Sequence, residues 1–248
     1  MTEADDIVEN ALLNGRVRLR QPARGYRAGM DAALLAAAVA ARPGQTVIEA
    51  GCGAGGALFQ IAARRPDTAL IGVEREAPVA DLARQNAALN GVADRTEILT
   101  ADVAEGFRAL DRVPCDWAVA NPPFFDDPGA LRAPAEGKRA AWMADDGLAA
   151  WTGFLLKAVK EGGRIVLIHR ADRLADLLGL LAPKAGSFAI LPVHPHADGP
   201  AKRVLVGATR TGKAPLRLLP PLVLHGRDDA KHTPRADAIL RGEARIDL

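Results

Sequence analysis

The tetrapeptide Asn-Pro-Pro-Phe at residues 121–124 directly follows an apolar run, Trp117 to Ala120. An amino group on an aromatic ring is a poor nucleophile because its lone pair is delocalised, so a site that uses it should accept hydrogen bonds from both N–H groups. Asn121 offers a side-chain oxygen. The two prolines cannot donate and have a restricted φ, which leaves the Pro122 carbonyl free as a second acceptor. Phe124 adds a ring face for stacking, worth about 1–3 kcal/mol per base. The motif therefore predicts a site for a planar amino group.

An Asn-Pro pair also begins many ordinary turns, so the motif is interpreted together with a glycine-rich loop upstream. Residues 49–55 read Glu-Ala-Gly-Cys-Gly-Ala-Gly and lie between an expected strand and an expected helix. Glycines there allow a tight turn and a close approach of a ligand, and the helix N-terminus adds oriented N–H groups. Because Gly51, Gly53 and Gly56 also satisfy the G-x-G-x-x-G pattern, the loop alone does not separate S-adenosylmethionine (SAM) from NAD.

Three carboxylates accompany the ends of successive expected strands. Glu49 precedes the first glycine, Glu74 closes the second strand, and Asp102 follows the third. Each alone is more often a solvated charge at a strand end. Open α/β sheets bind ligands at the carboxyl ends of their strands, and Glu74 is placed to accept from both ribose hydroxyls of either cofactor. Together with Asn121 after the fourth strand, the carboxylates favour SAM at this edge.

Short apolar runs alternate with longer Ala- and Leu-rich segments, which predicts an α/β, Rossmann-like fold with a doubly wound, mainly parallel seven-stranded sheet. The last two strands are joined by too short a loop for a crossover helix, so they should form an antiparallel hairpin. We expect an N-terminal extension (1–42), a core (43–212) and a C-terminal extension (213–248). Residues 126–145 and the tail beyond 212 show no pattern and are candidate substrate loops. The expected strands are 46–49, 69–73, 96–100, 117–120, 164–169, 188–193 and 203–209, and the expected helices are 31–41, 56–65, 77–90, 146–160 and 173–182.

The composition fits one soluble domain, because 49% of the 248 residues are hydrophobic and 25% are charged. The sequence has neither an uncharged apolar run long enough to cross a bilayer nor a signal-peptide pattern, so we expect a cytoplasmic protein without membrane association. Cys52 and Cys115 lack a neighbouring ligand cluster, which predicts buried thiols rather than a disulfide or a metal site. His194 and His196 lack a third ligand nearby, so no metal is expected. A monomer is favoured.

Over most of its length the chain resembles the bacterial tRNA(Val) adenine-N6 methyltransferase family, which consists of class I SAM-dependent methyltransferases. The resemblance implies SAM as the cofactor and methylation of an adenine next to the anticodon. It is carried by Asn14-Gly15-Arg16, Gly25-Tyr26-Arg27, Asp31 to Leu35, Glu49 to Gly55, Glu74, Asp102, the motif at 121–124, Lys202 to Val206, Leu224-His225-Gly226 and Thr233-Pro234.

The resemblance also implies a role for each site residue. Glu49 would lie near the ammonium group of SAM, Glu74 would hold its ribose, and Asp102 would accept from its adenine amino group. Asp31 would help to close the cofactor pocket, with a helix cap as the alternative. The catalytic residues would be Asn121, Pro122 and Phe124, and Asn121 would also contact the cofactor. Gly51, Gly53 and Gly55 would line the methionine part of SAM, and Arg27, Pro123, Phe125, Lys138 and Arg139 would contact the substrate.

Basic residues gather in three segments, and their convergence on the active edge would supply phosphate contacts that position a nucleic acid. Any one of them could instead be a solvated charge. The expected partner is RNA, and the resemblance specifies tRNA. The first stretch alternates with Val17 and Leu19, as in a hairpin strand. The basic residues are arginines 16, 18, 20, 24 and 27, then Lys138 and Arg139, then Arg227, Lys231, His232 and Arg235.

Three alternatives stay open. A glutamine side-chain amide in a translation factor also offers NH2 to the motif, and a guanine-N2 in ribosomal RNA does so as well. An extra N-terminal recognition domain would favour the glutamine substrate, but only about forty residues precede the first core strand. The third alternative is a non-enzymatic SAM- or NAD-binding module, against which the intact Asn121 and Phe124 argue.

Overall fold

The computed structural model describes residues 7–23, 28–123, 146–226 and 230–248. The short apolar runs of the sequence form one main sheet. Its strands are β3 (Thr46–Ala50), β4 (Ala69–Glu74), β5 (Thr96–Thr100), β6 (Cys115–Ala120), β7 (Val159–Arg170), β8 (Ala185–His194), β9 (Arg203–Arg210), β10 (Arg217–Leu218) and β11 (Leu222–Val223).

The sheet has the order β10-β8-β9-β7-β6-β3-β4-β5, and β11 also pairs with β8. All pairs from β7 to β5 are parallel, whereas β9 is antiparallel to both β7 and β8. The predicted mainly parallel sheet with an antiparallel last hairpin is confirmed. The two-residue strands β10 and β11 extend the seven expected strands at one edge.

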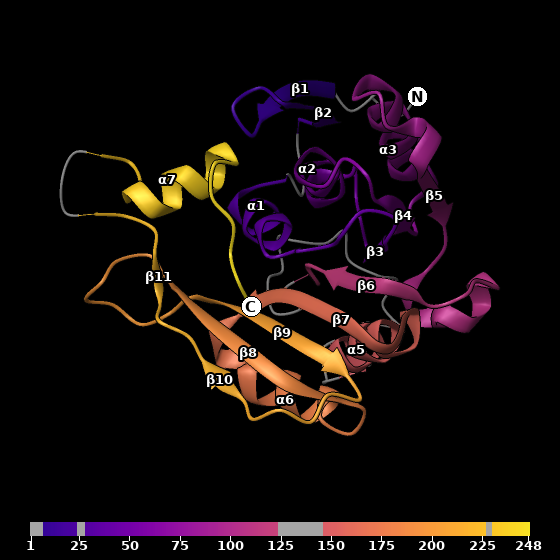
Figure 1. The fold of residues 1–248 in the computed structure, drawn as a ribbon. Helices are drawn as coiled ribbons and strands as arrows, with labels where there is room; N and C mark the ends of the chain where they lie inside the picture. Colours follow the sequence, from indigo (N-terminus) through magenta and orange to yellow (C-terminus); the bar gives the residue numbers. More distant parts are fainter. Residues whose placement is uncertain (1–6, 24–27, 124–145, 227–229) are drawn as a thin grey trace, which may run out of the picture.

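Helices cover both faces of the sheet, as Figure 1 shows. Successive strand residues point to opposite faces, so Val47 packs on one side with α1, α2 and α3 while Ile48 packs on the other with α5 and α6. The α-helices are α1 (Met30–Ala37), α2 (Gly56–Arg64), α3 (Ala77–Leu89), α5 (Asp146–Ala158), α6 (Leu174–Leu181) and α7 (Pro234–Arg241), and the 3-10 helices are η1 (Ala93–Arg95), η2 (Val103–Glu105), η3 (Phe107–Leu110) and η4 (Ala171–Arg173).

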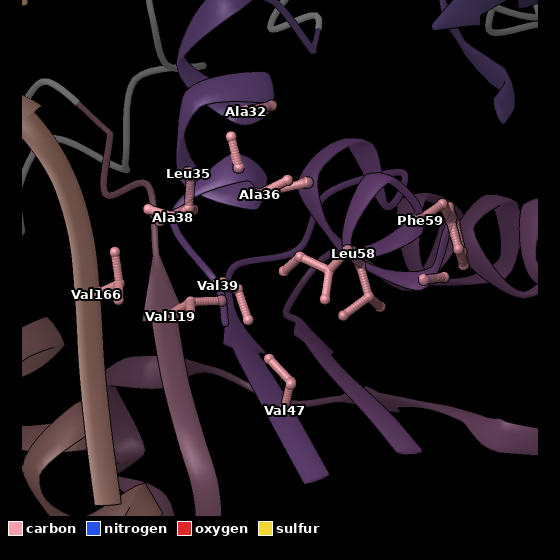
Figure 2. Close-up of a cluster of buried hydrophobic side chains, with 14 of the residues drawn as sticks. Ala32, Leu35, Ala36, Ala38, Val39, Val47, Leu58, Phe59, Val119 and Val166 are labelled. Carbon is pink, nitrogen blue, oxygen red and sulfur yellow. The ribbon is translucent and has the colours of Figure 1, made fainter. Parts of the chain in front are cut away.

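The first of these two cores fixes the helices that flank the glycine-rich loop. In Figure 2, Val47, Val119 and Val166 rise from three adjacent strands toward Leu35 of α1 and Leu58 of α2. Each of these five side chains is at most 1% exposed. Burying one such aliphatic side chain contributes about 1.5–3 kcal/mol relative to leaving it in water, so this layer holds α1 and α2 firmly against the sheet.

The N-terminal extension is a hairpin of β1 (Ile7–Leu12) and β2 (Val17–Pro22), which confirms the strand predicted from the alternation in this segment. Two asparagines of α3 bind its backbone. The Asn86 amide accepts from Arg20 N–H at 2.9 Å and donates to Arg20 O at 2.8 Å and to Ala54 O at 2.9 Å. Asn90 pairs with the backbone of Arg18 in the same way. The hairpin is thereby joined through Asn86 to the glycine-rich loop.

The C-terminal tail is more ordered than the sequence suggested, and the prediction that it lacks regular structure is wrong. It contains β10, β11 and α7. Thr233 caps α7, since its hydroxyl accepts from the Ala236 N–H at 3.3 Å, and Gly242 ends the helix with a φ of 78°. A Thr-Pro start and a glycine stop are recognisable helix signals, so this element was open to prediction.

The structure also describes the two cysteines and the apolar character of the helices. Cys52 and Cys115 are buried and free, as predicted. Burial raises the pKa of both thiols, to about 11 for Cys115, so both are protonated and unreactive at neutral pH. Within the described ranges, no helix combines the length and the apolar character that crossing a bilayer requires.

We expect Asn86→Ala to lower the free energy of unfolding by about 2–4 kcal/mol, because it leaves buried backbone groups of Arg20 and Ala54 without partners. Asn90→Ala is the matched control. Asn90 makes the same kind of backbone pair at a less buried position, where water can replace the lost contacts, so the cost should be about 1 kcal/mol. Urea unfolding measures both, and equal losses would contradict a joining role for Asn86.

Candidate functional site

The carboxyl ends of four neighbouring strands bring the predicted polar residues to one edge of the sheet. Ala50 of β3 pairs with Val73 of β4 and with Ala120 of β6, and Glu74 of β4 pairs with Thr100 of β5. The order of connection reverses between β3 and β6, which is where open α/β sheets bind ligands. Glu49, Glu74, Asp102 and Asn121 all lie within two residues of these pairs.

The glycine-rich loop between β3 and α2 requires glycine at two positions for reasons of space. Gly51 and Gly55 have φ values of 64° and 94°. A Cβ on Gly51 would lie 2.2 Å from the Trp151 indole, and one on Gly55 would lie 2.0 Å from the Phe59 ring. Gly53 has a φ of 55°, but a Cβ there would meet nothing within 4 Å. The loop therefore presents open space at Gly53 and is enclosed by rings on either side of it.

Glu49 is the most unusual group at this edge. It is 3% exposed, and its Oε2 has no hydrogen-bond partner among the described residues. Burial raises the pKa of Glu49 well above its ordinary 4.5, the Leu58 N–H lowers it, and the Glu74 carboxylate raises it further. A buried acceptor without a donor costs about 1–3 kcal/mol. An ammonium group would supply both the missing donor and the opposite charge, so Glu49 fits the amino-acid part of a cofactor such as SAM.

Glu74 is fixed in place at the end of β4. Its Oε2 accepts from the Gly53 N–H at 3.0 Å and its Oε1 accepts from the Glu76 N–H at 2.9 Å. These bonds hold the carboxylate beside the open side of the loop. Each carboxylate oxygen has a second lone pair, so Glu74 can still accept from a pair of ribose hydroxyls.

Asp102 and Asp31 are each engaged with the protein. Asp102 Oδ1 accepts from the Ala104 N–H at 2.8 Å and caps η2. Asp31 makes an ion pair with Arg203 at 2.9 Å. The N-cap of α1 is Gly29, so the helix-cap alternative for Asp31 is wrong. Asp31 instead joins the first turn of α1 to the start of β9, and its role in a cofactor pocket stays a prediction.

The motif at the end of β6 is described as far as Pro123. Asn121 and Pro123 are partly buried, and Pro122 is buried. Ala120, which precedes them, is fully buried between β3 and β7. The strand therefore places Asn121 beside the Glu49 end of β3. Five further predicted site residues lie outside the described residues: Arg27, Phe124, Phe125, Lys138 and Arg139.

The described arginines of the basic N-terminal stretch make contacts within the protein. Arg18 and Arg20 both pair with Glu9 across the hairpin, at 2.7 and 3.1 Å. Arg16 donates to the Arg241 carbonyl at 2.8 Å and thus holds the end of α7. The backbone of Arg18 lies against Asn90, at the end of α3 far from the carboxyl edge. Arg16, Arg18 and Arg20 thus help to hold the hairpin and α7 in place. Their contact with RNA phosphates stays a prediction, and Arg24 and Arg27 of the same stretch lie outside the described residues.

Two residues near the site carry no signal in the sequence. Trp151 of α5 covers Gly51, a contact that depends on how α5 packs on the sheet. His169 near the end of β7 is buried. Its pKa is lowered to about 4, mainly by this burial and to a smaller extent by the positive charges of Arg173 and Arg170. Its ring is therefore neutral at physiological pH. A tryptophan or histidine within an apolar segment is usually core, so only the packed structure identifies them.

Comparison with known proteins adds independent information. Residues 27–134 match the family model of the methyltransferase small domain. The tRNA1(Val) (adenine(37)-N6)-methyltransferase of Porphyromonas gingivalis is 29% identical over 172 residues, which cover 65% of this chain and 66% of that enzyme. The release factor glutamine methyltransferase of Chlorobaculum tepidum is 26% identical over 161 residues, 62% of this chain and 55% of that enzyme. The matches thus span less than two thirds of either enzyme.

A solved structure is similar over almost its whole length. It is described as a "predicted O-methyltransferase", protein Atu636 from Agrobacterium tumefaciens. Its TM-score is 0.72 and its sequence identity 26%, and the alignment covers 88% of this chain and 99% of that one. The chain therefore has the class I methyltransferase fold, and the predicted fold class is confirmed.

We expect Gly51→Ala to destabilise the protein by about 2–4 kcal/mol, because it adds a clash with Trp151 to the strain of a left-handed φ. Gly53→Ala is the matched control and should cost only the backbone strain, about 1–2 kcal/mol. Adding Trp151→Ala to Gly51→Ala should recover part of the loss. Urea unfolding tests the series. A Gly51→Ala loss no larger than that of Gly53→Ala would show that the indole does not cover the loop.

Glu49→Gln should stabilise the ligand-free protein and weaken SAM binding. Because the folded-state pKa of Glu49 lies above the unfolded value, its contribution to stability is present below about pH 4.5 and is lost as the pH rises through the folded pKa. Glutamine removes the charge, so the melting temperature at neutral pH should rise by about 2–4 °C per kcal/mol recovered. Thermal melts across pH, with and without SAM, measure both effects. A variant that binds SAM as tightly as the wild type would contradict the ammonium assignment.

Proposed function

We propose that the chain is a SAM-dependent methyltransferase and that it methylates an exocyclic amino nitrogen of a nucleic-acid base, namely adenine N6 in tRNA. The class I methyltransferase fold and the match of residues 27–134 to the methyltransferase small domain support the first part. The observation that carries the proposal is the juxtaposition of two features at the switch point of the sheet. Asn121, with two prolines after it, ends β6, and the buried Glu49 lies on the neighbouring β3. The first feature suits a planar amino group and the second an ammonium group.

The edge divides into a cofactor half and a substrate half. Glu49 and Glu74 lie on β3 and β4, and Asp102 follows β5. These carboxylates would bind, in turn, the ammonium, ribose and adenine groups of SAM. Asn121 follows β6, on the other side of β3. A methyl group between the two halves would face the amino nitrogen of a base held by Asn121, which is the arrangement that methyl transfer requires.

The bound cofactor supplies a methyl group activated by a sulfonium. An amino nitrogen that took this methyl group would gain positive charge, and the residues around it would have to stabilise that charge. The Asn121 side-chain oxygen and the Pro122 carbonyl accept from the two N–H groups and stabilise that charge in place. Pro122 is buried and its ring fixes φ, so its carbonyl would need little reorganisation to accept. The methylated nitrogen is strongly acidic and loses its proton to water.

The choice of tRNA adenine is supported by the name of the P. gingivalis relative and by sequence features outside the shared catalytic motif. Two of those features are the segments Asp31 to Leu35 and Lys202 to Val206. The ion pair between Asp31 and Arg203 brings the start of α1 to the start of β9. The C. tepidum relative favours a second candidate, the glutamine amide of a translation factor, because the same acceptors suit that NH2 group. RNA is thus the proposed partner, and the cytoplasm the proposed location.

Incubation with labelled SAM tests the proposal directly. The protein is mixed with total tRNA, with ribosomal RNA and with a glutamine-containing release-factor peptide, and the products are analysed by mass spectrometry. We expect N6-methyladenosine from tRNA. Asn121→Ala should lower the rate by about a hundredfold or more, the scale of one preorganised polar contact, while SAM affinity stays nearly unchanged.

Two results would count against the proposal. Methylglutamine, or N2-methylguanosine from ribosomal RNA, as the main product would replace adenine by another substrate. Full activity of Asn121→Ala would refute the role of the asparagine, whatever the substrate.

A further inference from the structure

Three histidines from separate segments form a row of rings, here called the histidine row: His196, His225 and His232. His196 lies in the loop after β8, His225 follows β11, and His232 precedes α7. The His196 and His225 ring centroids are 5.4 Å apart with an interplanar angle of 41°. Those of His225 and His232 are 5.2 Å apart at 29°, a stacked arrangement. Such distances are typical of packed aromatic pairs.

Backbone hydrogen bonds hold the three segments together, so the row is part of the fold rather than a chance contact of surface side chains. Leu224 N–H donates to His194 O at 2.8 Å, and His225 N–H donates to Pro195 O at 2.9 Å. Thr233 N–H donates to Leu224 O at 2.8 Å. The His225 ring is also fixed, because its Nδ1–H donates to the Lys231 carbonyl at 2.6 Å.

One end of the row faces solvent. His196 is exposed, whereas His225 and His232 are partly buried. Burial lowers the pKa of His232, and His225 and Lys231 lower it further, so at neutral pH the inner ring is uncharged. The row therefore presents an aromatic face at His196, backed by two more rings. Among the described residues, no three potential ligands are arranged to hold a metal ion, so metal binding does not account for the row.

The histidine row lies on the same edge of the sheet as Asn121. Strand β8 is antiparallel to β9, which is antiparallel to β7, which is parallel to β6. The ends of β6 and β8 therefore point the same way, as does the end of β11, which is parallel to β8. Three strand spacings, about 14 Å, separate β6 from β8 across the sheet. Along the strands, Ala120 is level with Ile190 of β8, six residues before His196. Figure 1 shows the β8–β9 loop and the segment before α7 on the same side of the molecule.

We propose that the histidine row is a stacking surface on which an unpaired base of the RNA substrate packs against His196. This inference depends on the proposed function, because it takes the substrate to be RNA. Histidine rings are among the side chains on which single-stranded bases stack. Because about 14 Å across the sheet and up to about 20 Å along the chain separate the two places, the stacked base would lie several nucleotides from the methylated one.

Charges beside the row fit the phosphates of the same strand. Lys202 and Lys231 are exposed, and neither makes an ion pair with a described residue. Lys231 supplies the carbonyl that fixes His225, and Lys202 ends the loop that carries His196, where its N–H donates to Val193 O at 3.0 Å. An exposed aromatic ring with lysines in the adjoining segments is the combination found where proteins bind single-stranded nucleic acid.

The test is RNA binding by the full chain saturated with S-adenosylhomocysteine. The probe is a fluorescein-labelled RNA stem-loop with unpaired adenines in its loop, and anisotropy gives the dissociation constant. His196→Ala should raise this constant by about 5- to 100-fold, the effect of losing one base–aromatic stack. His196→Phe should restore affinity to within about twofold of the wild type, because it keeps the ring face. A blunt RNA duplex should bind all three proteins equally.

His194→Ala is the matched control. His194 lies two residues away and is outside the row, and its Nδ1–H donates to Gly199 O at 2.8 Å within the same loop. This variant should bind the stem-loop nearly as the wild type does. A 2-aminopurine placed at each unpaired position in turn should be quenched at one position by the wild type and by His196→Phe. His196→Ala, which lacks the ring, should quench it at no position.

Three results would overturn the inference: unchanged affinity of His196→Ala, failure of His196→Phe to restore binding, or an equal loss in His194→Ala, which would assign the effect to loop order. Failure of the proposed function looks different. In that case the wild type would neither bind the stem-loop nor methylate RNA, and a glutamine peptide would be methylated instead. If the wild type methylates RNA and His196→Ala binds normally, only the stacking surface is refuted.

Discussion

The site depends on one buried acceptor, the Glu49 Oε2 atom at the carboxyl end of β3, for which the described part of the chain supplies no hydrogen-bond donor. A chain under selection for stability alone would replace this carboxylate, because its burial raises the pKa and its lone pairs lose their water. Its neighbours explain why the position suits a ligand. Gly53 opens space on one side, Glu74 is fixed by two backbone N–H groups, and Asn121 follows the adjoining strand. A bound ammonium group would offset the cost at Glu49 by supplying both a donor and the opposite charge.

The extensions at both ends of the chain support that edge from the helical layer. Asn86 connects the N-terminal hairpin to Ala54 in the glycine-rich loop. Arg64 of α2 donates to the carbonyls of Ile239 and Ala244, and the Ile246 N–H donates to Ala37 O at 2.9 Å. The C-terminal segment is thereby bound to α1 and α2, the helices that flank the loop. The same extension carries two of the three rings of the histidine row, so it contributes both to stability and to the surface of the edge.

The sequence predicts the sheet well because its signals are local. Each of the seven main strands was expected within about five residues of its observed bounds, as were helices α1, α2, α3, α5 and α6, since apolar runs and glycine turns determine them. The carboxylates could be placed on one edge for the same reason. The features that the sequence did not predict are contacts between elements far apart in the chain. Trp151 reaches Gly51 only through the packing of α5, and Arg18 and Arg20 are engaged by Glu9 only in the actual register of the hairpin. The two-residue strands β10 and β11 are too short to give a periodic signal.

The most direct measurement is an experimental structure of the protein with S-adenosylhomocysteine bound. The account predicts that the ammonium group of the ligand lies about 2.7–3.2 Å from Glu49 Oε2, with its ribose hydroxyls on Glu74 and its sulfur facing the Asn121 side. A ligand bound elsewhere, or an ammonium group held by other residues while Glu49 Oε2 keeps no partner, would contradict it.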